Sequence, residues 1–168
     1  MPTPRLRKSP RLKEFDYVGP LAAHVVCVTD FRHPFFVEHL GAVQFEIKAR
    51  QHTIVCDQPR ENFGHDEGMT PPELLLASLG SCAAFYAAQY LRKHKLAAEG
   101  TRVRVLAEKA KDPARLENFR IEIDAPVELD EKHRAGIDAA VHHCLIHNTL
   151  LHPPQIEIAI DHAVLTSH

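Results

Sequence analysis

The fold of this chain is decided by the stretch Thr70-Pro71-Pro72-Glu73-Leu74-Leu75-Leu76-Ala77-Ser78-Leu79-Gly80-Ser81-Cys82. Glu73 stands three residues after Thr70, which is the spacing of a capping box, and proline suits the first helical position. The residues that follow predict a helix from about Pro71 to Lys95. From Leu74 to Leu91 this helix is apolar around nearly its whole circumference. In a soluble protein such a helix has to be covered on every side.

The length of this predicted helix approaches that of a membrane span, but its surroundings argue against a membrane. Its neighbours are amphipathic strands, and the sequence contains no second segment of this kind. The four or five strands predicted for one chain of 168 residues are too few to enclose the helix. We therefore expect an intertwined homodimer with no membrane partner.

Composition sets the domain organisation. A chain of 168 residues with 45% hydrophobic content is long enough for one ordinary core, which we place in a single domain at 21–168. Residues 1–20 are predicted to form a flexible basic arm, because 4–13 is rich in lysine and arginine. The net charge of −2 predicts no nucleic-acid partner for the domain. The N-terminal residues do not have the pattern of a secretory signal, so a cytoplasmic location is expected.

The remaining pattern predicts an α+β fold. Apolar and polar residues alternate in several short runs, as they do in half-buried strands. A second helix is predicted to follow Asp130, with its apolar positions continuing on one face to Cys144 and Leu145. Strands, a long helix, strands, a helix and a strand in this order are typical of an α+β domain. The predicted strands cover residues 21–29, 43–49, 103–107, 119–125 and 156–160, and residues 51–56 either continue the second strand or begin its neighbour.

Four cysteines are far apart in the sequence and include no Cys-x-x-Cys pair: Cys27, Cys56, Cys82 and Cys144. A small secreted disulfide scaffold would be denser in cysteine. Cys82 and Cys144 lie on predicted helices in apolar surroundings, which suggests a buried dithiol that cycles to a disulfide. Core packing without redox chemistry is the alternative for both residues. Cys27 and Cys56 are predicted strand residues and are assigned no role.

Two motifs together resemble the OsmC/Ohr superfamily. The first is Gly68-x-Thr70-Pro71-x-Glu73-Leu74-Leu75-Leu76-Ala77-x-x-Gly80-x-Cys82, and the second is Cys144-x-Ile146-His147-Asn148-x-Leu150. With the strand pair at 45–59, the resemblance covers about residues 42–160. It implies an OsmC-like fold, in which antiparallel sheets wrap around long central apolar helices in an obligate intertwined homodimer.

The resemblance also implies thiol-dependent reduction of hydroperoxides, organic ones in particular. Cys82 falls on the family's peroxidatic cysteine and Cys144 on its resolving cysteine. Peroxide would oxidise Cys82 to a sulfenic acid, Cys144 would condense with it to a disulfide, and an external dithiol would reduce that disulfide. No cofactor and no metal are expected.

The chain departs from the peroxidase members of the family in the groups that activate the cysteine. In those members an arginine does so, held by the glutamate of an Asn-Pro-Glu motif. Here Pro72 aligns with that glutamate, and Glu73 lies one position later. The arginine candidates are Arg50 and Arg32, and no motif fixes either. Glu73 and Arg50 are our candidates, although Glu73 also suits a helix cap and Arg50 a solvated strand face.

The histidines around Cys144, which are His142, His143 and His147, would also suit other functions. A zinc site here would have only three ligands, which are Cys144, His147 and Cys82. The simpler interpretation is that the histidines lie on the exposed face of a helix. A Cys–His pair for acyl transfer, with His147 as base, lacks a recognisable oxyanion element. No phosphate-binding loop or dinucleotide fingerprint is present. A non-catalytic dimer that binds small molecules or senses redox state remains the alternative to a peroxidase.

Overall fold

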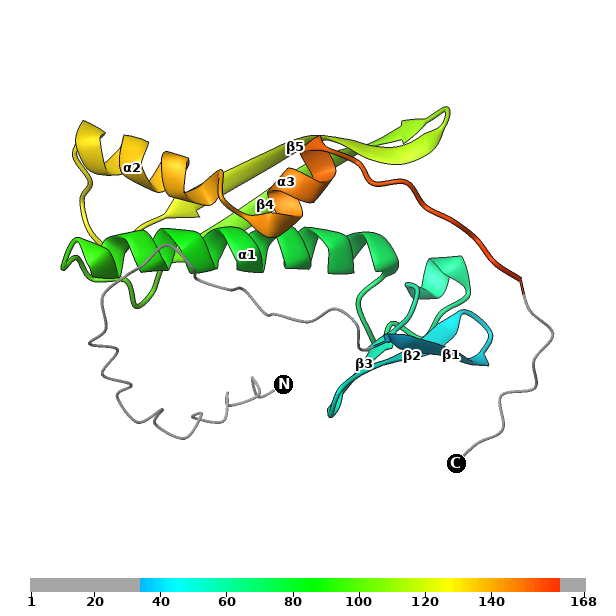
Figure 1. Cartoon of the computed structure of the whole chain (residues 1–168). Coiled ribbons are helices and arrows are strands. Elements are labelled where there is room, and N and C mark those ends of the chain that lie inside the picture. The colour runs from blue at the N-terminus through cyan, green and yellow to red at the C-terminus, as the bar shows by residue number, and fades with distance from the viewer. Residues whose placement is uncertain (1–33, 161–168) are drawn as a thin grey trace. The chain divides into compact units, whose positions relative to one another are not determined.

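The computed structural model describes residues 34–160, and Figure 1 shows the order of their helices and strands. The α+β class predicted from the sequence is confirmed. The long helix α1 packs against α2, against the short helix α3 and against the strands β4 and β5. In chain order the elements are β1 (Phe36–Gly41), β2 (Gln44–Ala49), β3 (His52–Cys56), the 3-10 helix η1 (Arg60–Asn62), α1 (Pro71–Lys93), β4 (Arg102–Lys111), β5 (Ala114–Asp124), α2 (Glu131–Val141) and α3 (Leu145–Leu151).

The strands of the described residues form two antiparallel sheets. β1, β2 and β3 follow one another in the first sheet, and β4 pairs with β5 in the second. The sequence analysis missed β1, because all six of its residues are exposed and it therefore has no buried face to produce an alternating pattern. The predicted strand at 21–29 and the predicted arm at 1–20 lie outside the described residues.

Among residues 34–160, helix α1 buries one stripe of its surface. Four residues at intervals of four share one face of the helix, and each is at most 1% exposed. Ile137 and Val141 of α2 pack on this stripe. Elsewhere on the helix Leu75 and Phe85 remain 37% and 42% exposed. The four stripe residues are Leu79, Ala83, Ala87 and Leu91.

By length and composition alone, α1 could also cross a membrane. The core helices of soluble proteins pass the same test, so this property is weak evidence for a membrane span. Only 28% of its most apolar window is buried inside the structure. Much apolar surface of α1 is therefore left without a covering partner among the described residues.

The prediction of a single second helix that carries Cys144 is wrong. Helix α2 ends at Val141, and α3 begins after Cys144. Cys144 has extended backbone angles (φ −61°, ψ 124°), and its sulfur accepts the N–H of His147 as the N-cap of α3. The helical spacing of apolar residues continues across this break, which is why the periodicity alone did not reveal it.

The predicted last strand is also wrong for the described residues. Residues 153–160 have no regular secondary structure. Ile156, Ile158 and Ile160 are 83%, 82% and 88% exposed. The alternating pattern is real, but a strand forms only when a neighbouring strand supplies hydrogen bonds, and no described strand lies beside this segment.

The loop between β3 and α1 is organised around Asp57, which is 1% exposed. Its carboxylate accepts backbone N–H groups from Gln58 at 2.8 Å, His65 at 3.0 Å and Glu67 at 3.2 Å. The Gln44 side-chain amide lies at 3.5 Å. Burial acts to raise the pKa of Asp57, but these hydrogen bonds together outweigh it and lower the pKa.

Asp57→Asn is expected to lower the melting temperature at neutral pH, because the charged acceptor of three amides is lost. A carboxyl whose folded-state pKa is depressed stabilises the protein above its unfolded pKa, and this stabilisation disappears as the pH falls through the folded pKa. The difference in melting temperature between the two proteins should therefore shrink on acidification. Thermal melts from pH 7 to about pH 3 test this. Asp66→Asn, an exposed substitution in the same loop, is the control, and a constant difference would contradict the assignment.

Candidate active site

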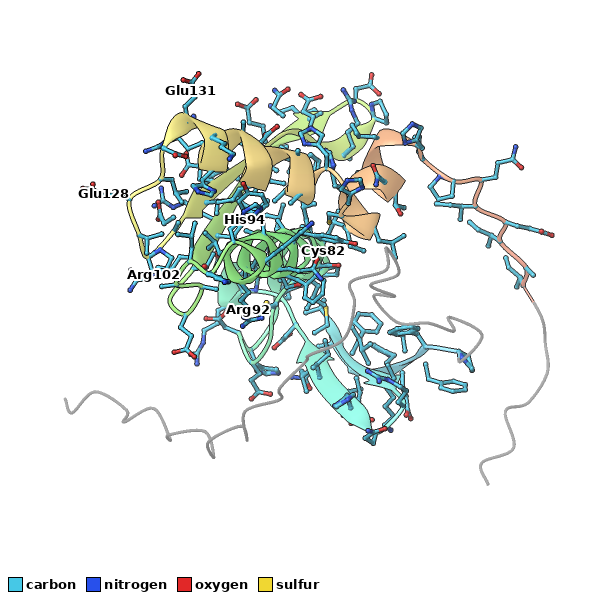
Figure 2. All side chains as sticks on the ribbon, turned by 60° about the vertical axis from the view of Figure 1, so that its left-hand side comes forward. Cys82, Arg92, His94, Arg102, Glu128 and Glu131 are labelled. Atoms are coloured by element: carbon cyan, nitrogen blue, oxygen red, sulfur yellow. The ribbon has the colours of Figure 1, made fainter. Side chains whose placement is uncertain are left out.

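Helix α1 carries Cys82, and the N-terminus of this helix is capped by side-chain hydrogen bonds. The helix has a complete capping box, in which the Thr70 hydroxyl accepts the Glu73 N–H at 3.4 Å and Glu73 accepts the Thr70 N–H at 2.7 Å. The capping box predicted from the sequence is therefore confirmed. Figure 2 shows Cys82 on α1, and its side chain is partly exposed. This thiol can accordingly meet a solute that reaches the helix surface.

Cys144 is held quite differently, because it is completely buried (0% exposed) at the start of α3. The N–H of His147 donates to its sulfur at 3.4 Å, and the N–H of Ile146 also hydrogen-bonds it. The Asn148 side-chain amide donates to the His142 carbonyl at 3.2 Å and so ties α3 back to the end of α2. The break between the two helices thus fixes the position of this sulfur against α1.

The structure brings Cys82 and Cys144 together as a hydrogen-bonded pair. Burial, followed by the hydrogen bond with Cys82, raises the pKa of the Cys144 thiol to about 11, while the amides of His147 and Ile146 act in the opposite direction. Cys144 is therefore protonated at neutral pH, and its S–H can donate to the sulfur of Cys82. The two thiols thus differ in exposure, and the surroundings of Cys144 favour its protonated form.

Glu73 is engaged at the helix start. One of its carboxylate oxygens, Oε2, accepts both the N–H of Thr70 and the Thr70 hydroxyl, the latter at 2.8 Å. These two hydrogen bonds lower the pKa of Glu73. The geometry supports the role of a helix cap for Glu73.

No cation is seen to assist the thiols within the described residues. Arg50 occupies the turn between β2 and β3 in a left-handed conformation (φ 57°). Its guanidinium makes no hydrogen bond or ion pair with another residue of the range 34–160. Arg32 lies outside the described residues. The structure therefore brings together two of the four predicted site residues, the cysteines, and does not bring Arg50 to them.

An apolar cavity of about 570 Å³ lies between α1, β5, α2 and α3. Leucine, isoleucine, valine and phenylalanine side chains form most of its wall. Three polar side chains, Asp138, His142 and His147, also line it. The sequence analysis did not single out Asp138. Its position four residues before His142 on a helix was the available signal, because side chains four residues apart share a face. The apolar lining residues are Leu75, Leu79, Leu116, Phe119, Ile121, Ile123, Val141, Leu150 and Leu151.

The histidines near Cys144 differ in their surroundings. His142 and His143 are exposed, whereas His147 is partly buried. Among residues 34–160, no group of three or more histidine, cysteine, aspartate or glutamate side chains is arranged to hold a metal ion. The described part of the chain thus offers no support for the zinc alternative.

The model of the OsmC-like protein family matches residues 64–159, which include both cysteines of the pair. This chain belongs to the OsmC-like protein family. No curated protein matches the sequence. The family membership predicted from the two cysteine motifs is confirmed.

Solved structures share the fold of this OsmC-like protein. A protein of Psychrobacter arcticus, named as a candidate osmotic stress induced and detoxification response protein, is 26% identical with a TM-score of 0.63, over 68% of this chain and 85% of that one. An OsmC-like protein of Mycoplasma pneumoniae is 21% identical with a TM-score of 0.59, over 73% and 89%. An organic hydroperoxide resistance protein OsmC of Legionella pneumophila is 14% identical with a TM-score of 0.50, over 70% and 89%. The OsmC-like fold is therefore shown.

The contribution of the N-terminal cap of α1 to stability can be measured by removing the Thr70 hydroxyl. Thr70→Ala is expected to lower the free energy of unfolding by about 1 kcal/mol, since the N–H of Glu73 loses its acceptor. Urea denaturation provides the measurement. Ser78→Ala, which removes a hydroxyl from the body of the same helix, should leave the stability unchanged or slightly higher. Equal stability of Thr70→Ala and the wild type would contradict a structural role for the capping box.

Proposed function

We propose that this protein is a thiol-dependent peroxidase that reduces organic hydroperoxides, with hydrogen peroxide as a further substrate. The observation that carries the proposal is the hydrogen-bonded pair of a partly exposed thiol, Cys82, and a buried thiol, Cys144. A pair in this arrangement has one sulfur that a solute can reach and a second that can close a disulfide with it. Two unreactive packing cysteines would have no need of this asymmetry.

The first step oxidises Cys82. Its thiolate attacks the terminal oxygen of the hydroperoxide, so that an S–O bond forms and the O–O bond breaks. The departing alkoxide takes a proton and leaves as an alcohol. Cys82 is then a sulfenic acid, and the peroxide has been reduced by two electrons.

The second step involves Cys144. Its sulfur attacks the sulfenic sulfur of Cys82, the S–S bond forms, and the hydroxyl group leaves as water. An external dithiol returns both cysteines to thiols by disulfide exchange. A cytoplasmic location, where thiol reductants are abundant, suits this cycle.

Family membership and one neighbour of the same fold support the proposed substrate class. The chain belongs to the OsmC-like family, and the Legionella pneumophila neighbour is an organic hydroperoxide resistance protein. The cavity beside α1 is mostly apolar, which suits a hydroperoxide with a hydrocarbon tail. We assign no nucleic-acid or membrane partner.

We also propose that the working form is a homodimer. Among the described residues, α1 has a long apolar surface that is only partly covered. β1 is exposed along its whole length, and three isoleucines at 156, 158 and 160 are almost fully exposed. Apolar surface of this extent is costly in water, and a second copy of the chain would cover it.

One observation favours a second candidate function. No lysine or arginine among the described residues hydrogen-bonds either thiol, and Glu73 is engaged by Thr70. A thiol without a stabilising cation reacts slowly. In that case the protein would be a dimer that senses oxidation or binds an apolar small molecule, with little peroxidase turnover.

The proposed peroxidase predicts a sharp difference between two serine variants. With cumene hydroperoxide and an external dithiol, Cys82→Ser should lose catalytic peroxide consumption entirely, because the nucleophile is absent. Cys144→Ser should still consume about one equivalent of peroxide per chain and then stall or turn over slowly. Cys56→Ala is the matched control, because Cys56 is buried and outside the pair. Equally negligible consumption by all four proteins would exclude the peroxidase and leave the sensing or binding function.

The dimer predicts the behaviour of α1 in solution. At low micromolar concentration, sedimentation equilibrium should report twice the mass of the 18.9 kDa chain. Phe85→Lys, which puts a charge on the uncovered face of α1, should yield monomers or aggregates. Lys132→Glu, an exposed change on α2, should leave the dimer intact. A stable wild-type monomer would show that α1 needs no partner.

A further inference from the structure

The buried position of Cys144 creates a chemical requirement. To attack the sulfenic acid of Cys82, Cys144 has to give up the proton that its surroundings hold firmly. The sulfur is 0% exposed, so bulk hydroxide reaches it poorly. A neighbouring base would remove the barrier, provided that it lies beside this sulfur and has a free nitrogen or oxygen.

His147 is the candidate, because its backbone contacts this sulfur and its ring has a free nitrogen. Its backbone N–H donates to the Cys144 sulfur at 3.4 Å, and its ring Nδ1 is four covalent bonds from that backbone nitrogen. Nδ1 is also buried and has no hydrogen-bond partner within the described residues. A buried polar atom without a partner is costly, so its persistence here calls for an explanation. A nitrogen that exchanges a proton with Cys144, directly or through one water, provides one.

The groups around His147 suit an imidazole that becomes charged for part of the cycle. The ring of His142 packs against it edge to face, with centroids 5.1 Å apart. His142 is oriented by its Nδ1, which lies 2.8 Å from the Asp138 carbonyl oxygen and 3.6 Å from the Asp138 carboxylate. Asp138 lines the same cavity, so that its carboxylate provides a negative charge near the two rings. At the start of α3 the titratable group is Cys144, which Cys82 of α1 hydrogen-bonds, and α1 and β5 contribute only apolar side chains to this cavity.

We propose that His147 is the general base of the resolving step and accepts the proton of Cys144 as the disulfide forms. This inference rests on the proposed peroxidase function. In the step, Cys144 loses its S–H proton to His147, and its electron pair forms the S–S bond. The S–O bond of the Cys82 sulfenic acid breaks, and the hydroxide takes the proton from His147 to leave as water. The Cys144 sulfur is oxidised, the sulfenic sulfur is reduced, and His147 is unchanged at the end.

The test isolates the resolving step and does not require a peroxide. An aromatic disulfide such as 5,5′-dithiobis(2-nitrobenzoate) forms a mixed disulfide with Cys82, which Cys144 then displaces to give the Cys82–Cys144 disulfide and a free aromatic thiol. Acid quenching and peptide mass mapping follow that second event over time. The proteins compared are the wild type, His147→Gln and the control His143→Gln, whose side chain is exposed at the same helix break. A parallel series with one equivalent of cumene hydroperoxide follows sulfenic acid and disulfide at the same two cysteines.

His147→Gln should close the disulfide about 100-fold more slowly than the wild type, with His143→Gln unchanged. The pH profiles should differ as well. Closure in the wild type should level off above the range in which imidazoles lose their proton, whereas closure in His147→Gln should continue to rise about tenfold per pH unit, as expected when hydroxide is the base. A merely structural role of His147 would lower the rate without changing the shape of this profile.

Equal closure rates in the wild type and His147→Gln would overturn the proposal. If His147→Gln did not fold, the wild-type profile would carry the test, and a rate that rises continuously to about pH 10 would overturn it. Failure of the peroxidase is recognised separately, because the wild type would then form no sulfenic acid with cumene hydroperoxide. In that case the aromatic disulfide would still decide the role of His147.

Discussion

The rest of this structure depends on one constraint, which is that the apolar surface of helix α1 has to be buried. Helix α1 supplies the buried stripe on which α2 packs, contacts β4 and β5, and carries the accessible thiol of the site. Because one stripe of it is covered among the described residues, the same helix accounts for the core and for the dimer that we propose. The pair of cysteines then lies where α1 meets the start of α3.

The pair of cysteines shows how the fold makes two chemically similar side chains different. Cys82 lies on a regular helix with part of its surface open, whereas Cys144 lies at a break between two helices and is fully enclosed. Burial keeps the proton on Cys144, and two amides at the start of α3 oppose that effect. This difference arises from the backbone, because it depends on where α2 ends.

The parts of the fold that could be predicted from the sequence were those with local signals. The start of α1 was correct because Thr70, the prolines and Glu73 form a cap within four residues. The break before α3 was missed, because the apolar spacing continues across it and cysteine is not a residue expected at an N-cap. Ile156, Ile158 and Ile160 alternate as strand residues do, but a strand also requires a neighbour, which a single sequence does not specify. In the site, the motifs predicted roles for Cys82 and Cys144 but not the distance between their sulfurs, and the surroundings of Arg50 and His147 likewise depended on tertiary packing.

The sulfur that caps α3 also bears on how this position could change over evolutionary time. Serine, threonine, aspartate and asparagine all cap helices better than cysteine does, and each is of similar size. A lineage with no use for a thiol would gain helix stability by exchanging Cys144 for one of them. Stability alone therefore does not account for cysteine at this position, and a relative that has serine or aspartate here would have kept the helix cap while giving up the thiol.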